Sequence, residues 1–305
     1  MEGERVRGIR NTDDLVPFFK ADAPDTFSAL VNEYIEWLRV RGHNEIAIYT
    51  RKWVLAMFMT WCEERGLRRP REITLPILER YQRHLFYHRK RDGKALSFGT
   101  QKARLVTLRS FFKWLTRKHH IPTNPASEMD LPKKGRSLPK VVLSEKETEE
   151  ILREPNIRTH LGLRDRAILE TFYATGMRRM ELVNLKIYDL NLDLGTVMIR
   201  EGKGKKDRVI PIGKRAQQWI NKYVEDIRPE MVLGNDEGCL FLTYLGQGFT
   251  PHAMSHLARN YVKKAKLGKM GACHLFRHTC ATLMLENGAD VRFLQEMLGH
   301  VKLDT

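Results

Sequence analysis

Cysteine is scarce in this sequence, and its 4 cysteines among 305 residues form no CxxC pair. This pattern excludes a disulfide-stabilised secreted domain and indicates reduced thiols in a cytoplasmic protein. Long apolar runs are also missing, since the densest one, residues 54–62, is far shorter than the roughly 20 residues that span a bilayer. Residues 1–14 carry charges throughout, which excludes a secretory signal, and we expect no membrane partner.

Acidic residues are too few to balance the basic ones. Lysine and arginine number 53 against 37 aspartates and glutamates, which gives a formal net charge of +16. Such an excess is typical of proteins that bind polyanions. Nucleic acid is favoured over a membrane surface, because no segment combines a wide apolar face with a lysine-rich one.

The first third of the chain has helical periodicity. Residues 1–22 are polar and predict a loose N-terminal arm, whereas residues 23–118 predict a helical domain. Glycines, a proline and an Asp-Gly pair separate its apolar segments, as expected between the helices of a bundle. The expected helices are 26–40, 45–65, 74–91 and 97–118.

A second domain follows a proline-rich segment. Four prolines in residues 119–140 predict a semi-extended linker, and residues 141–305 then predict a domain that is mostly helical. Residues 196–200 and 207–212 predict a β-hairpin. Its main helices are expected at 163–174, 213–227, 251–266, 274–286 and 290–298, and Ser144 with Glu147 predicts a capping box that opens an earlier one. The expected fold class is therefore mainly α with a small antiparallel β-sheet.

The helix expected at 97–118 carries a basic face opposite its apolar one. Between Arg89 and Lys140, lysine and arginine outnumber acidic residues fourteen to three. A face that only keeps a helix soluble usually mixes both signs, so we favour phosphate contact. The expected DNA-binding residues are Lys102, Arg109, Lys113 and Arg117.

Arg178 lies in ATGMRRMEL (174–182), just after a glycine that permits close approach of the backbone to a ligand. An arginine fork can bind two oxygens of one phosphate, which lysine cannot do. Glu181, three residues later, could orient it. A surface cation after a turn is the competing interpretation.

The expected hairpin ends in GKGKKDRVIPI (202–212). A lysine at its tip could deliver a proton to a departing oxygen. Spacing alone leaves Lys203, Lys205 and Lys206 open, and glycine and lysine are also ordinary turn residues. The GxxxxGK[ST] order of a Walker phosphate loop is absent.

His274 and Arg277 are three residues apart in HLFRHTCATLML (274–285), so both could face one ligand at the start of a helix. Zinc is the competing interpretation, because two cysteines and His278 lie close by. HLFRH lacks the glutamate of HExxH, however, and we expect no metal. His300 ends a fourth motif, LGH (298–300), where a histidine could bind phosphate or simply cap a helix.

The ordered set of TGxR, a GK-bearing hairpin, HxxR and LGH over residues 174–300 resembles the tyrosine site-specific recombinases, also called phage integrases and Xer-type recombinases. The resemblance implies a two-domain DNA clamp, with a helical core-binding domain and a mixed α/β catalytic domain. It also implies binding as a homotetramer to double-stranded DNA with inverted-repeat core sites, without a cofactor, in the cytoplasm and associated with the nucleoid.

The resemblance assigns roles by position. Enzymes of this family cut and rejoin DNA through a 3′-phosphotyrosyl intermediate. Arg178 and Arg277 would clamp the phosphate and His300 would assist, while Lys203 would be the general acid and His274 the general base.

The family's nucleophilic tyrosine follows the LGH histidine, yet none of the 9 tyrosines here follows His300, and the sequence ends at Thr305. We therefore expect a catalytic domain that is incomplete at its C-terminus, and a chain that binds DNA without cleaving it.

Alternatives are a catalytically dead competitor at recombination sites, a zinc hydrolase and a type IB topoisomerase. Retained catalytic residues argue against a mere binder. The target sequence and the phage, transposon, integron or chromosomal setting stay open.

Overall fold

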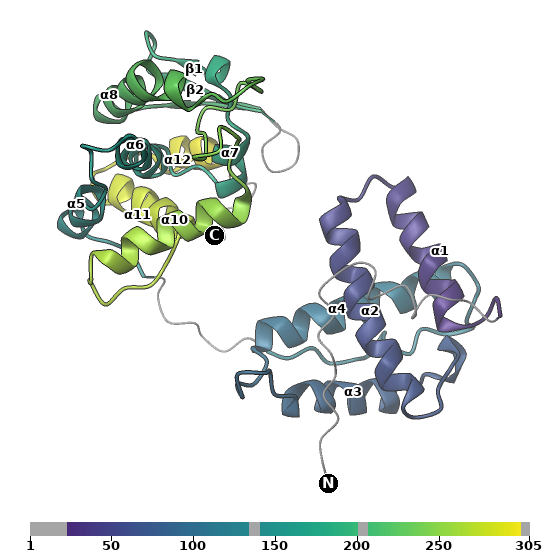
Figure 1. The fold of residues 1–305 in the computed structure, drawn as a ribbon. Helices are drawn as coiled ribbons and strands as arrows, with labels where there is room; N and C mark the ends of the chain where they lie inside the picture. Colours follow the sequence, from purple (N-terminus) through teal and green to yellow (C-terminus); the bar gives the residue numbers. More distant parts are fainter. Residues whose placement is uncertain (1–22, 134–140, 201–206, 300–305) are drawn as a thin grey trace. The chain divides into compact units, whose positions relative to one another are not determined.

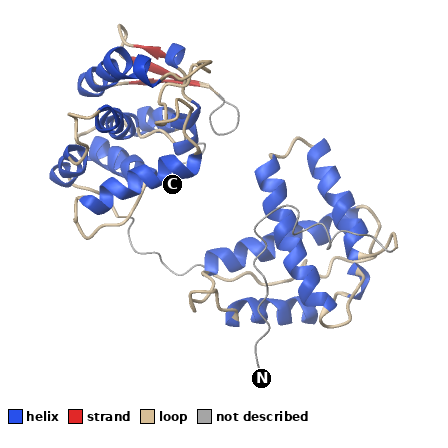
Figure 2. Cartoon of the chain, viewed as in Figure 1, coloured by secondary structure: helices blue, strands red, loops and turns tan. Residues whose placement is uncertain are grey.

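A computed structural model describes residues 23–133, 141–200 and 207–299. The chain divides into two compact units, Met1–Ser137 and Leu138–Thr305 (Figure 1). Both units are dominated by helices, and the strands of the second unit form one small antiparallel sheet (Figure 2). The predicted fold class is confirmed.

Within residues 23–133, the N-terminal unit has four α-helices at the places that the apolar periodicity predicts. Three of them follow an N-cap residue whose side chain accepts a hydrogen bond from a backbone N–H of the first turn. These N-cap residues are Thr26, Asn44 and Ser97. The helices are α1 (Phe27–Val40), α2 (Glu45–Glu63), α3 (Leu75–Tyr87) and α4 (Phe98–Arg117), with a 3₁₀ turn, η2, at Pro70–Glu72.

Aromatic side chains fill the core of this unit. Phe58 packs edge to face on Tyr81, with ring centroids 4.9 Å apart, and both are buried. Ile121, Ala126 and Met129 are buried against the same core. The packing of the N-terminal unit therefore includes residues that the proline pattern assigns to the linker.

The C-terminal unit is built around α6 (His160–Thr175), whose residues are mostly buried. The predicted capping box of Ser144 and Glu147 opens α5. A π turn, η4 (Tyr223–Ile227), interrupts the helix expected at 213–227. The other helices are α7 (Arg179–Asn184), α8 (Lys214–Lys222), α9 (Arg228–Met231), α10 (Pro251–Lys264), α11 (Cys273–Glu286) and α12 (Val291–Leu298), with α5 at Glu145–Arg153 and a 3₁₀ turn, η3, at Ile187–Asp189.

The sheet has the order β1-β2-β3, with β1 at Leu190–Asn191, β2 at Thr196–Ile199 and β3 at Arg208–Pro211. Ile199 pairs with Arg208, so the predicted hairpin is confirmed. β1 was not expected, because two residues are too few to show a period of two.

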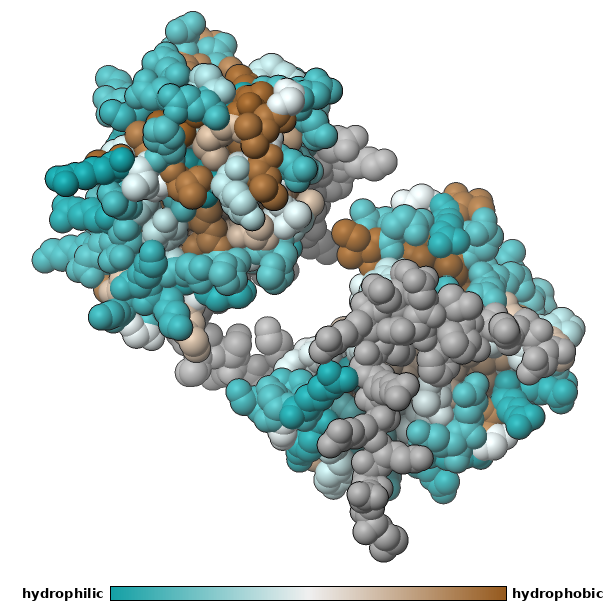
Figure 3. Space-filling view, in the orientation of Figure 1, coloured by the Kyte–Doolittle hydropathy of each residue, from teal (hydrophilic) through white to brown (hydrophobic). Residues whose placement is uncertain are grey.

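Hydrophilic side chains separate the apolar patches on the visible face of each unit (Figure 3). None of the helices in the described ranges has the length and apolar character needed to cross a bilayer.

Candidate active site

The end of α6 brings the first motif against α12. Gly176 ends α6 in the left-handed region, with φ +56°. A Cβ there would lie 2.8 Å from Leu298 Cδ2, so glycine permits this close approach. Arg178 is then the N-cap residue of α7, and its backbone N–H donates to Glu181 Oε2 at 2.7 Å.

Arg277 joins the ends of α6 and α12 from the interior. It lies on α11 with 6% of its surface exposed. Its Nη1 donates to the Gly176 carbonyl at 2.8 Å and its Nη2 to the Leu298 carbonyl at 2.6 Å. Burial, and then repulsion from Arg178, lowers the pKa of Arg277 to about 10. The guanidinium stays charged at neutral pH.

A third arginine completes the cluster. Arg208, the first residue of β3, donates from Nη1 and Nη2 to the two oxygens of Glu181, at 3.0 and 2.7 Å. Arg178 Nη1 donates to the same carboxylate at 2.9 Å. Burial alone would raise the pKa of Glu181, but the bonds from Arg208 and Arg178 outweigh it and hold this pKa below its usual range. Three cations therefore surround one anion, which leaves an excess of positive charge.

These three guanidiniums bind successive carbonyls at the end of α12. Arg208 Nε donates to Met297 O at 2.9 Å, Arg277 to Leu298 O, and Arg178 Nη2 to Gly299 O at 2.9 Å. The last carbonyls of a helix have no partner within it and carry partial negative charge. The arginine cluster, meaning Arg178, Arg208 and Arg277, thus caps the helix that precedes His300.

The structure brings together two of the five predicted catalytic residues, Arg178 and Arg277. His274 is exposed at the start of α11, one turn before Arg277. Lys203 and His300 lie outside the described residues, so their roles stay predictions. Sequence reasoning missed Arg208, because its partner Glu181 is 27 residues away in the chain.

On α4, Lys102, Lys113 and Arg117 are exposed. Arg109 differs from them, since it is only partly exposed and its Nη2 donates to the Met129 carbonyl. This guanidinium holds the segment after α4 against the N-terminal unit. Phosphate contact by the other three side chains stays a prediction.

In the part of the chain that the structure describes, no group of three or more His, Cys, Asp or Glu is placed to hold a metal. Cys273 and Cys280 of the zinc interpretation are buried, and burial raises the pKa of the Cys280 thiol to about 11. A zinc site needs thiolates, so this region disfavours one.

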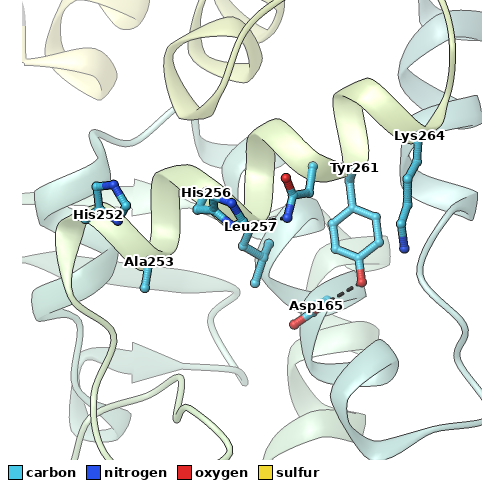
Figure 4. A pocket seen from close by; sticks show the side chains of 8 residues that line it. Asp165, His252, Ala253, His256, Leu257, Tyr261 and Lys264 are labelled. Atoms are coloured by element: carbon cyan, nitrogen blue, oxygen red, sulfur yellow. Dashed lines mark hydrogen bonds between the residues drawn. The ribbon is translucent and has the colours of Figure 1, made fainter.

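A pocket of about 540 Å³ lies along α10 and α6. His252, His256 and Tyr261 lie along α10, and Tyr261 Oη donates to Asp165 at 2.7 Å (Figure 4). Burial and this carboxylate raise the pKa of Tyr261, which makes it a poor nucleophile.

Residues 141–305 match the Phage integrase family. The chain belongs to this family. Among its relatives is tyrosine recombinase XerC 2 of Ralstonia nicotianae, 46% identical over 89% of this chain and 78% of the relative. Tyrosine recombinase XerD of Lacticaseibacillus casei is 32% identical over 90% of this chain and 91% of the relative.

Solved structures share the integrase fold. A lambda integrase dimer bound to a COC′ core site has a TM-score of 0.69 at 18% identity, over 91% of this chain and 96% of that one. XerH recombinase in a pre-cleavage complex with difH has a TM-score of 0.68 at 20% identity, over 89% of this chain and 77% of that one.

Proposed function

We propose that this integrase-family chain is a site-specific DNA recombinase that cuts and rejoins strands through a 3′-phosphotyrosyl intermediate. The observation that carries the proposal is the arginine cluster, in which Arg178 and Arg208 share the Glu181 carboxylate while Arg277 is held by backbone carbonyls alone. A phosphodiester would balance part of the excess positive charge. Guanidiniums that are already fixed stabilise the charge that develops on phosphate oxygens without reorganising during the reaction.

The chemistry follows from the assigned roles. A tyrosine oxygen bonds to phosphorus while the bond to the 5′ oxygen breaks. His274 takes the tyrosine proton and Lys203 gives a proton to the 5′ oxygen, while Arg178, Arg277 and His300 hold the non-bridging oxygens. Bond energy is kept in the phosphotyrosyl linkage, so rejoining needs no cofactor.

The nucleophile is not among residues 1–305 in this proposal. None of the tyrosines follows His300. Burial raises the pKa of Tyr173, Tyr223 and Tyr261 in the C-terminal unit, so these are poor substitutes. A polypeptide of residues 1–305 then binds DNA without cleaving it.

The proposed partner is double-stranded DNA with inverted-repeat core sites, bound by a homotetramer in the cytoplasm and associated with the nucleoid. The net charge of +16 and the exposed Lys102, Lys113 and Arg117 support binding to phosphates. In this proposal residues 23–118 and 141–305 are the two halves of a DNA clamp, joined by residues 119–140, and residues 1–22 form an arm.

The test is selection of binding sites by the full chain from a library of random DNA duplexes. We expect inverted repeats. A methylphosphonate is then placed at each phosphate of the selected site in turn, which removes one charge at a time. We expect the largest loss of affinity at one phosphate per half-site, where the arginine cluster binds. Equal binding of all sequences, or an even response across all phosphates, would overturn the proposal.

A further inference from the structure

Arg208 is not one of the five residues predicted to carry the chemistry, yet it shares the Glu181 carboxylate with one of them, Arg178. It begins β3, where it pairs with Ile199 at the end of β2, so residues 200–207 connect these two positions. That connection contains Lys203. Only 13% of the Arg208 side chain is exposed.

All three nitrogens of the Arg208 guanidinium donate to the protein. Nη1 and Nη2 bind the two oxygens of Glu181, and Nε binds the Met297 carbonyl. Glu181 lies on α7 and also accepts from the side chain and the backbone N–H of Arg178. A single side chain therefore joins three elements: β3, α7 and the last turn of α12.

We propose that Arg208 is a positioning residue for strand cleavage, an inference that rests on the proposed function. It fixes the returning strand of the hairpin against the carboxylate that orients Arg178. Through Met297 it also fixes the end of the helix that precedes His300. In this scheme Arg208 is assigned no phosphate contact, and its guanidinium holds Glu181 and the Met297 carbonyl.

The planar fork of arginine is what this role requires. Lysine has the same charge, but its single ammonium cannot donate in parallel to both oxygens of a carboxylate and also reach a carbonyl on another helix. If Arg208 only neutralised the charge of Glu181, a lysine at this position would serve equally well. If it sets geometry, Arg208→Lys will fold and bind DNA but will hold Arg178 in the wrong place.

The test compares the affinity of each protein for two versions of the selected duplex. One has its natural phosphate at the sensitive position found by the methylphosphonate scan, and the other has a methylphosphonate there. The ratio of the two affinities measures recognition of that phosphate. We expect Arg208→Lys to reduce the ratio about tenfold, with binding of the methylphosphonate duplex unchanged.

Arg215→Lys is the matched control. Arg215 on α8 also bridges two carboxylates, donating to Glu170 at 3.0 Å and to Glu149, and it contacts none of the arginine cluster's partners in the described residues. Its substitution should lower the thermal midpoint and leave the affinity ratio as in the wild type.

The outcomes are separable. If the wild-type chain has no sensitive phosphate, the proposed function fails. If the wild type has one and folded Arg208→Lys keeps the full ratio, only the positioning role is overturned. Should Arg208→Lys not fold, Arg208→Gln, which keeps one donor for Glu181, carries the same expectation. If neither variant folds, Arg208 is a stability determinant and the positioning role is likewise overturned.

Discussion

The carboxylate of Glu181 accepts hydrogen bonds from the guanidiniums of Arg178 and Arg208 and from a backbone amide. Removing this carboxylate would leave buried guanidiniums without their counterion. The stability lost in that case is far larger than when one partner of a solvent-exposed ion pair is removed. We expect Glu181→Gln to lower the free energy of unfolding at pH 7 by about 3 kcal/mol. Urea unfolding monitored by circular dichroism measures this.

Glu149→Gln is the control for that change, because Glu149 pairs with Arg215 near the surface. Its cost should stay below about 1 kcal/mol. Equal losses in the two variants would show that Glu181 does not hold the cluster.

The lowered pKa of Glu181 also predicts a pH dependence. A carboxyl with a folded pKa below its unfolded value contributes stability above the unfolded value, about 4.3, and this stability is lost as the pH falls through the folded pKa. We expect the wild type to lose stability below about pH 4 more steeply than Glu181→Gln. Parallel curves of unfolding free energy against pH would contradict this expectation.

At the scale of elements, the end of α12 is set by Gly299, which has φ +65°. A Cβ at this position would lie 3.3 Å from Arg178 Nη1 and 3.4 Å from Arg208 Cζ. Gly299→Ala should cost about 1 kcal/mol from backbone strain and should also displace the arginines. We therefore expect weaker recognition of the sensitive phosphate, measured by the affinity ratio.

Gly288→Ala separates the two effects. Gly288 has φ +82°, and a Cβ there would meet nothing within 4 Å. The Gly288→Ala protein should therefore have the same backbone strain as Gly299→Ala and an unchanged affinity ratio. A reduced ratio in Gly288→Ala would mean that strain alone explains the result for Gly299.

The basic side chains of α4 should separate into two classes. We expect Lys113→Gln to reduce the slope of log affinity against log salt concentration by about 1, as for the loss of one phosphate contact. Arg109→Met should leave the slope unchanged and lower stability by about 1 kcal/mol, because its guanidinium binds the Met129 carbonyl. Salt titrations of DNA binding and urea unfolding test both. A slope change for Arg109→Met would place it with the phosphate ligands.

Elements with local signals were predictable. α1 to α4 follow apolar periods and cap residues that lie within a few positions of each other. The motif spacing also led to Arg178 and Arg277, and the fold brings them together. The bond of Arg208 to Glu181 joins residues from different elements, and the bond of Arg109 to Met129 spans 20 positions. No periodicity encodes such contacts, because the fold of the whole unit creates them.

At the scale of the whole molecule, the described residues form two separate hydrophobic cores, one in each unit. Each core belongs to one unit, so neither needs the other's side chains to exclude water. The arginine cluster lies in the C-terminal unit, whereas the basic face of α4 lies in the N-terminal one. Affinity and phosphate chemistry are therefore assigned to different units in the proposed function.

The last prediction concerns the nucleophile, which in the proposed function is not one of residues 1–305. Residues 1–305, mixed with the selected duplex carrying a nick beside the sensitive phosphate, should give no covalent protein–DNA adduct on a denaturing gel. A chimera in which the C-terminal segment of the Ralstonia relative follows residue 299 should form one, because this chain supplies the arginine cluster and the graft supplies the tyrosine. Arg277→Lys in the chimera should abolish most of the adduct, since lysine cannot bind both the Gly176 and Leu298 carbonyls. An adduct formed by residues 1–305 alone, mapped to one of their own tyrosines, would refute the proposal that they lack the nucleophile.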